Sequence, residues 1–347
     1  MRVLKSAIRA SAAVVASALA LASILALGGA QAQEQKTYVM KITLPTLKDT
    51  VNQVADNIAA AVNKESGGRI KAEVYPASQL GSIPRQIEGT QFGAIQLALV
   101  PPEFFVGVDE RFEMMAAPGL VSTMQQGQRV AADPAVLKLM LGLGANKGLH
   151  GAGMFMATPS HIISKTGIRR LDDFKGKKLR IFASDFQYQA LKRLGATPVA
   201  MTLGDVLPAI QQGAIDGAIA ALNVYVPMQF QDAAKYVTET NQPAIFIIAA
   251  LNPKWRDSLP KDLQQLVDRV IARETVAINK VSSEFVEKMR KTWVARGGEL
   301  ISLPPNEYES MMKTLDSVGH DVTKAKPQLA AAYKIVTDAA AKAKATH

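Results

Sequence analysis

An arginine lies in a short segment that otherwise has the pattern of a β-strand. In "GKKLRIFAS", residues 176–184, the apolar Leu179 and Ile181 alternate with Arg180 and Phe182, and a period of two is typical of a strand. At the carboxyl end of a strand in an open α/β sheet, an arginine can hold a carboxylate ligand through two parallel charge-assisted hydrogen bonds. The same position also suits a structural salt bridge or a charged sheet edge, and the spacing alone does not choose between these.

Other chemistry has little support in the sequence. The four histidines, at positions 150, 161, 320 and 347, lack the paired spacing of metal ligands, and cysteine is absent. "GLGANKG" contains G-x-G, but it follows a helix pattern and precedes a strand pattern, the reverse of a dinucleotide-binding motif. Ser160 and His161 are adjacent without a nucleophile-elbow pattern. We therefore expect no metal, no cofactor and no enzymatic activity. A hydrolase that uses Ser160 or His161 is the less favoured alternative.

The first 32 residues have the pattern of a secretory signal peptide. Three basic residues precede an uncharged, apolar run over residues 10–29, and "AQA" over residues 30–32 matches an A-x-A cleavage site. An uncleaved membrane anchor is the alternative, because the run approaches the length that spans a bilayer. Cleavage after Ala32 would remove those three charges from the formal net charge of +10. The remaining charges are mixed along the chain without a basic block that alternates with aromatic residues, so we expect no nucleic-acid partner.

After residue 32 the chain contains two series of alternating strand and helix patterns. These two series predict two α/β domains. The first series reads strand, helix, strand, helix, strand and ends at "AIQLALVP", residues 94–101. A mainly irregular segment and two helical pieces follow, and the alternation resumes at "GLHGAGMFMA", residues 148–157. Residues 261 to about 295 predict one long helix with an apolar inner stripe. A strand at residues 299–304 and two closing helices complete the predicted elements.

Several long segments resemble the DctP-type solute-binding proteins of TRAP (tripartite ATP-independent) transporters. "ISKTGIRRLDDFKGKKLRI", residues 163–181, is similar to that family's N-S-x-x-P-I-x-x-P-x-D-L-K-G-x-K-I-R-V pattern, and "LGATPVAMTLGDVLPAIQQGAIDGA", residues 194–218, follows it as in the family. "SGGRIKAEVYPASQLG" (66–81) and "FIIAALNPKWRDSLPKDLQQLV" (246–267) resemble two further family segments. The likeness covers nearly all of residues 36–320, in order and at the expected spacing.

The resemblance implies an α/β fold of two domains. Each domain is expected to be a mixed, mostly parallel sheet flanked by helices, with a long bridging helix and a ligand cleft between the domains. We expect residues 33–155 and 245–285 in domain I, and residues 156–244 and 286–347 in domain II. The resemblance further implies a periplasmic protein that binds a small organic carboxylate and delivers it to the membrane permease of a TRAP transporter. We expect the protein to be a monomer. A sensor subunit that presents its ligand to a receptor is an alternative.

The resemblance also implies that Arg180, at the arginine of the family's K-I-R strand, grips the ligand carboxylate. "FMATPSHIISK", residues 155–165, lacks the second arginine that some members carry, and Asn223 follows Ala220, which stands where an asparagine is common. One arginine favours a monocarboxylate with an apolar or hydroxylated body, unless Arg85 or backbone N–H groups serve a second carboxylate. The remaining residues that we expect around the ligand are Gln79, Glu103, Phe104, Met156, His161, Phe182, Asn223 and Tyr225.

Overall fold

The computed structural model describes residues 36–345. The expected signal peptide, residues 1–32, lies outside the described residues. From Tyr38 onward the described chain forms one compact unit. None of the helices in this part of the chain is long and apolar enough to cross a bilayer.

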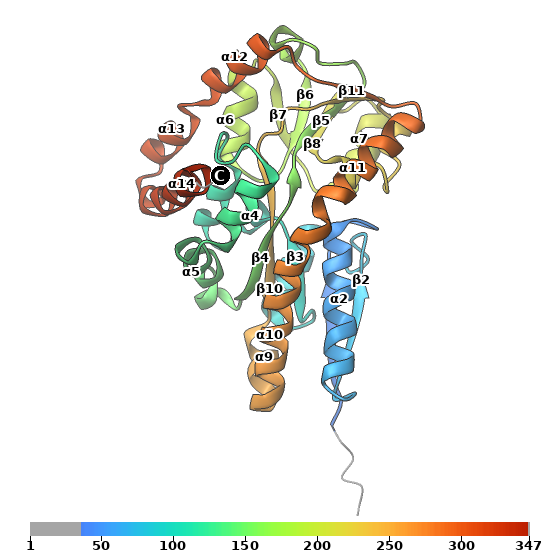
Figure 1. Cartoon of the computed structure of the whole chain (residues 1–347), viewed down its shortest axis with the longest axis vertical. Coiled ribbons are helices and arrows are strands. Elements are labelled where there is room, and N and C mark those ends of the chain that lie inside the picture. The colour runs from blue at the N-terminus through green and yellow to red at the C-terminus, as the bar shows by residue number, and fades with distance from the viewer. Residues whose placement is uncertain (1–35, 346–347) are drawn as a thin grey trace, which may run out of the picture. The chain divides into compact units, whose positions relative to one another are not determined.

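Two mixed β-sheets form the framework, and helices pack against both (Figure 1). The first sheet has the strand order β2-β1-β3-β10-β4. Its strands are β1 (Tyr38–Thr43), β2 (Ile70–Tyr75), β3 (Leu97–Val100), β4 (His150–Pro159) and β10 (Ala244–Leu251). The first three are parallel, whereas β10 runs antiparallel to β3 and β4. Every residue of β10 is buried, as expected for a strand that is covered on both faces.

The helices of this half begin and end at recognisable signals. α2 (Thr50–Glu65) starts after Asp49, whose side chain accepts a hydrogen bond from the N–H group of Asn52. α3 (Ile83–Phe92) has a proline in its first turn and ends at Gly93, whose φ of +88° suits glycine. Between β3 and β4 lie the short helices η1 (Pro102–Phe105), η2 (Glu110–Ala116) and η3 (Ala145–Lys147), with α4 (Met124–Ala132) and α5 (Pro134–Gly142).

The second sheet has the strand order β11-β9-β5-β8-β6-β7. Its strands are β5 (His161–Ser164), β6 (Lys178–Ile181), β7 (Thr197–Ala200), β8 (Gly217–Ala220), β9 (Tyr236–Thr238) and β11 (Glu299–Ile301). β6, β7 and β8 are parallel, and α6 (Asp185–Arg193) and α7 (Leu203–Gln211) connect them. β5 runs antiparallel to β8 and β9. The short strands β5 and β9 are absent from the predicted elements.

The chain passes between the two sheets at three places: from β4 to β5, from β9 to β10, and at the end of α10. The prediction of one long helix is wrong here, because α10 (Lys261–Ala277) and α11 (Asn279–Ala295) are separate helices joined at Ile278. Ile278 keeps helical angles, φ −59° and ψ −26°. α10 packs on α2 and β4, whereas α11 packs on α8 (Leu222–Tyr225) as well as on β4 and β11. The pair therefore bridges the sheets, with a change of direction between the two helices (Figure 1).

Three helices, rather than the predicted two, close the described chain: α12 (Pro305–Leu315), α13 (Val318–Ala325) and α14 (Ala330–Ala345). α13 packs on α6, and α14 packs on α4 and α5. One hydrophobic cluster includes Met154 of β4 and Ile162 of β5. This cluster continues from one sheet to the other and therefore marks no boundary between two domains. The predicted domain boundaries stay a prediction.

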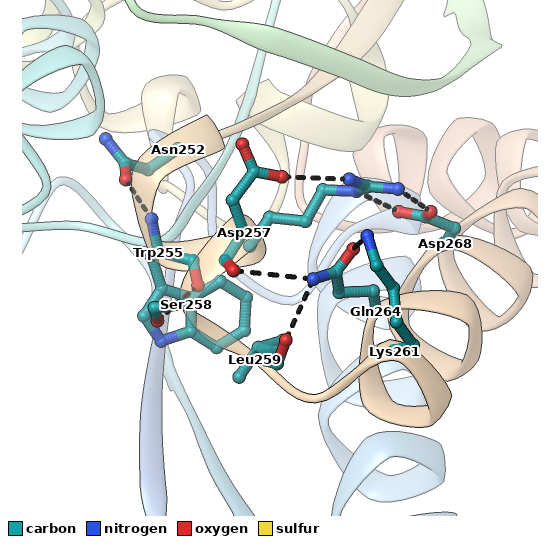
Figure 2. Close-up of polar contacts among 9 residues, drawn as sticks. Asn252, Trp255, Asp257, Ser258, Leu259, Lys261, Gln264 and Asp268 are labelled. Atoms are coloured by element: carbon teal, nitrogen blue, oxygen red, sulfur yellow. Dashed lines mark hydrogen bonds and ion pairs between the residues drawn. The ribbon is translucent and has the colours of Figure 1, made fainter.

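A polar network fixes the turn from β10 through α9 (Pro253–Ser258) into α10 (Figure 2). Asn252 caps α9, since its side-chain oxygen accepts a hydrogen bond of 2.7 Å from the N–H group of Trp255. The same amide donates to the carbonyl oxygen of Thr90, next to the first sheet, at 2.8 Å. Nε of Arg256 on α9 donates to Oδ1 of Asp268 on α10 at 2.9 Å. These bonds join α9 to α3, which contains Thr90, and to the bridging helix α10.

We expect Asn252→Ala to lower the free energy of unfolding by about 1–3 kcal/mol, because it removes the cap of α9 and leaves a buried carbonyl without its donor. Urea denaturation followed by circular dichroism measures the change. Lys254→Ala in the exposed part of α9 is the control and should change the stability by less than about 0.5 kcal/mol. Equal effects of the two substitutions would contradict this role of Asn252.

Candidate ligand-binding site

A cavity lies where the carboxyl ends of strands from both sheets meet. Its free volume is about 40 Å³, well below the range of roughly 300–1,000 Å³ that is usual for small-molecule sites, so an organic ligand requires the walls of the cavity to move apart. Its lining residues are Pro45, Thr46, Asp49, Val51, Ile83, Pro101, Phe104, Ala157, Thr158, Arg180, Phe182, Leu203, Ala220, Asn223, Val224, Ile245 and Ile247. Many of them lie at or just after the ends of β1, β3, β6, β7 and β8. This is the edge at which open α/β sheets bind ligands.

Arg180 is held rigidly in the wall of this cavity. It lies in β6, with Val199 of β7 and Ala218 of β8 as its neighbours in the sheet, and it is 1% exposed. Its Nε donates to the carbonyl oxygen of Met201 at 2.8 Å, and its Nη1 donates to that of Ile219 at 2.9 Å. Nη2 takes part in neither bond. Two carbonyl groups therefore orient the guanidinium, and N–H donors remain for another partner.

Two aromatic rings stack on the guanidinium. Its central carbon lies 4.5 Å from the ring centroid of Phe182 and 5.9 Å from that of Phe104. The two rings stack on each other with centroids 5.3 Å apart and an interplanar angle of 26°. Phe104 follows β3 of the first sheet and Phe182 follows β6 of the second. The cation–π contacts stabilise the buried charge, and the stack connects the two sides of the cavity.

The positive charge of Arg180 is not neutralised by a nearby carboxylate. Burial lowers its pKa to about 10, so the guanidinium is charged at neutral pH. No acidic side chain of the described residues lies within ion-pair distance of it, although the Glu103 carboxyl interacts with it electrostatically. Burial raises the pKa of Glu103 to about 8, so that carboxyl is mainly protonated at neutral pH. A buried charge without a counter-ion is costly, and an anionic ligand group would compensate it.

Three further side chains present unpaired polar atoms to the cavity. Oδ1 of Asn223 has no hydrogen-bond partner among the described residues, and Oγ1 of Thr46 and Oδ2 of Asp49 make no hydrogen bond of normal geometry there. Burial raises the pKa of Asp49 to about 6, against the opposing effects of the backbone N–H of Asn52 and of the Thr46 side chain, which interacts with this carboxyl. Nδ2 of Asn223, on α8, donates to Oγ1 of Thr50 on α2 at 3.4 Å. This bond joins elements that pack on different sheets.

The structure brings four of the nine predicted ligand-binding residues together on the cavity wall: Arg180, Phe104, Phe182 and Asn223. Glu103 precedes Phe104 and is fully buried, but it does not line the cavity. Gln79 is exposed on the loop between β2 and α3 and is no part of the cavity. Arg85, the other cation considered, is largely exposed and lies 3.6 Å from Glu88.

Three predicted residues serve the interior rather than the cavity. Met156 is buried in β4 and fills the space beside Gly127 of α4, where a Cβ atom would lie 1.8 Å from its sulfur. The hydroxyl of Tyr225 lies 2.8 Å from the carbonyl oxygen of Ala218 and 2.9 Å from that of His161, so it holds α8 to β5 and β8. His161 is buried in β5, and burial lowers its pKa to about 4. None of the three lines the cavity.

The residues of the hydrolase alternative are also interior. Ser160 and His161 are both buried, and neither lines the cavity. Among residues 36–345 there is no group of three or more side chains that could hold a metal ion.

Sequence reasoning missed Asp49 and Thr46. Asp49 caps α2 through the N–H group of Asn52 and also lines the cavity. The available signal was its position after the first predicted strand, on the same sheet edge as the segment after β3.

This arrangement of two sheets and one enclosed site defines a solute-binding protein. The chain belongs to the family described as bacterial extracellular solute-binding protein, family 7 (DctP), whose model matches residues 43–325. This match confirms the family resemblance that we found in the sequence segments.

Known proteins similar to the chain support the same family. It is 25% identical over 307 residues to the uncharacterized protein YiiZ of Salmonella typhimurium, with 87% of this chain and 91% of YiiZ covered. It is 27% identical to the C4-dicarboxylate-binding periplasmic protein DctP of Rhodobacter capsulatus, with 65% and 68% covered. The solved structure of the sugar acid binding protein DctPAm from Advenella mimigardefordensis, in complex with galactonate, matches the fold with a TM-score of 0.84 and 21% identity, over 89% of this chain and all of that one. The two-domain α/β fold expected from the sequence is confirmed.

We expect Glu103→Gln to stabilise the protein at alkaline pH. The folded protein holds the Glu103 proton up to a pKa of about 8, whereas the unfolded chain releases it near 4.5. Stability from this group is therefore fully present below pH 4.5 and is lost as the pH rises towards 8. Glutamine stays neutral, so the variant should gain about 1–4 kcal/mol at pH 8 and nothing at pH 4.

Urea denaturation at both pH values measures the difference. Glu309→Gln, at an exposed position on α12, is the control and should show no such gain. A Glu103→Gln effect of the same size at pH 4 and pH 8 would mean that Glu103 is ionised in the folded protein.

Proposed function

We propose that this protein binds a small organic carboxylate in the cavity and delivers it to the membrane permease of a TRAP-type transporter. One observation carries the proposal: the buried guanidinium of Arg180 has free donors and no ion-pair partner among the described residues. A ligand carboxylate would accept hydrogen bonds from those donors and neutralise the charge. The names of two similar proteins support a carboxylate, since one is called C4-dicarboxylate-binding and the other holds galactonate.

The proposal includes export and a purely binding role. Residues 1–32 would direct secretion and be removed after Ala32, so that the mature protein works as a monomer in the periplasm. The family's description as extracellular supports this location. Binding without turnover is supported by the burial of Ser160 and His161 away from the cavity. A ligand-presenting sensor is the second candidate, and transport of the bound ligand by reconstituted permease subunits would distinguish the two.

We expect Arg180→Ala to weaken carboxylate binding by about 2–5 kcal/mol, or roughly 30-fold or more, because the ligand's charge would lose its buried partner. Arg180→Lys should also bind poorly, since an ammonium group cannot reproduce the planar fork that two carbonyls orient. Isothermal titration calorimetry, with ligands found by a thermal-shift screen of organic acids, measures both.

Arg85→Ala is the matched control, because Arg85 is exposed and outside the cavity. It should leave the affinity unchanged. Circular dichroism must show that both Arg180 variants fold, because Arg180 also bonds two backbone carbonyls. Binding by folded Arg180→Ala within a few-fold of the unmodified protein would rule out the clamp.

We also expect the ligand to draw the two predicted domains together by a hinge movement at the three chain crossings. The Phe104–Phe182 stack and the Asn223–Thr50 hydrogen bond join the two sides of the cavity, as contacts of a closed form would. Small-angle X-ray scattering should therefore show a smaller radius of gyration at saturating ligand. Arg180→Ala with the same ligand is the control. An unchanged radius in protein that binds would argue against closure.

A further inference from the structure

Three side chains on the cavity wall carry buried oxygen atoms that accept no hydrogen bond of normal geometry from the described residues. We call Thr46, Asp49 and Asn223 the acceptor set. They are 7%, 2% and 1% exposed, so none is open to bulk water. Oδ1 of Asp49 accepts the N–H group of Asn52 at 2.8 Å, whereas Oδ2 makes no hydrogen bond of normal geometry among the described residues, although the Thr46 side chain interacts with this carboxyl. Buried acceptors in this state are costly unless a donor reaches them.

The acceptor set and Arg180 belong to the same cavity but to different parts of the fold. Thr46 and Asp49 lie between β1 of the first sheet and α2, whereas Arg180 lies in the second sheet. Asn223 is hydrogen-bonded to Thr50, the residue after Asp49, which places it beside Asp49. A ligand held by Arg180 therefore also meets Asp49 on the other side of the cavity.

We propose that the acceptor set makes the site selective for monocarboxylates whose remaining polar groups are hydroxyls, and that Asp49 excludes dicarboxylates. This inference rests on the proposed function, because Arg180 must hold the carboxylate end. Ligand hydroxyls then donate to Asp49 Oδ2 and to the other two acceptors, so that both kinds of buried polar group are satisfied by one molecule.

A dicarboxylate does not fit these groups. Arg180 is the one basic residue among the described lining residues, so a second carboxylate would meet Asp49 without a compensating cation. Two buried carboxylates in contact repel each other. Burial raises the pKa of Asp49 only to about 6, which leaves it mainly ionised at neutral pH.

A ligand ammonium group fits less well than hydroxyls. The oxygens of Thr46 and Asn223 are neutral, and both aromatic rings on the wall, Phe104 and Phe182, already stack on the guanidinium. The charge of Asp49 is partly balanced without a ligand, because Asp49 sits at the amino end of α2 and accepts a backbone N–H group there.

Matched ligand pairs test the selectivity. Galactonate and galactarate differ only in the replacement of a terminal CH₂OH group by a carboxylate. The pair 4-hydroxybutyrate and succinate makes the same comparison on a shorter chain, and 4-aminobutyrate carries an ammonium group instead. Calorimetry at pH 7.5 should give the hydroxylated monocarboxylate of at least one pair an affinity about 10- to 100-fold above its dicarboxylate partner.

Asp49→Asn tests the residue itself. Asparagine caps helices as well as aspartate does, so α2 should remain intact and the melting temperature nearly unchanged. The variant removes the negative charge and adds an N–H donor, so it should weaken the monocarboxylate about tenfold and reduce or reverse the preference over the dicarboxylate. Asp56→Asn is the same chemical change at an exposed position on α2 outside the cavity, and it should leave both affinities unchanged.

The outcomes separate this inference from the proposed function. A dicarboxylate or 4-aminobutyrate that binds the unmodified protein as tightly as the hydroxylated acids overturns the acceptor set's role. So does a preference that Asp49→Asn leaves unchanged. In either case loss of binding in Arg180→Ala would still support the carboxylate clamp. If no carboxylate binds at all, the proposed function fails together with this inference.

Discussion

The guanidinium of Arg180 lies in the interior between two backbone carbonyls and two aromatic rings, without a carboxylate beside it. A charge of this kind tolerates burial only because carbonyl dipoles and π-faces surround it, and its pKa falls but stays near 10. The nearby Glu103 could have neutralised it. Instead, burial raises the pKa of that carboxyl to about 8, so the arginine keeps its electrostatic pull for an anion that enters the cavity.

The fold around this charge serves to bring strand ends together. The carbonyl of Met201 follows β7 and that of Ile219 belongs to β8, so the parallel pairing of β6, β7 and β8 places both acceptors against the β6 arginine. The ends of β1 and β3 in the first sheet supply Asp49 and Phe104 on the other side. Neither sheet alone completes the site. The three chain crossings and the bridging helices α10 and α11 therefore matter because they hold two half-sites in facing positions.

The polar groups of the cavity are unequal in a way that bears on specificity. Among the described residues, Arg180 is the one basic residue that lines the cavity, and two hydrogen bonds to carbonyl oxygens hold it in place without a ligand. The acceptors opposite it include one carboxylate, which is stabilised at the amino end of α2. We infer that such a cavity selects ligands at both ends, because the Arg180 end accepts a carboxylate and the Asp49 end repels one. Proteins of similar sequence or fold include one that is named for a C4-dicarboxylate and one that holds galactonate.

The sequence by itself determined the family and the strand–helix alternation, because each of these follows from short-range pattern or from long segments with family spacing, and it singled out Arg180 as a charged residue in a strand. It also identified Phe104, Phe182 and Asn223, which directly follow strand ends. The tertiary structure decided which other strand-end residues reach the cavity. His161 and Tyr225 are buried in the interior instead, where the Tyr225 hydroxyl contacts the carbonyl oxygens of His161 and Ala218, long-range contacts that the local sequence does not reveal. The role of Asp49 as the cap of α2 already explains an aspartate at this position. Only the tertiary structure shows that Asp49 also lines the cavity and that its Oδ2 makes no hydrogen bond of normal geometry among the described residues. The break at Ile278 also depends on tertiary packing, because α10 packs on α2 and β4, whereas α11 extends from β4 to α8 and β11.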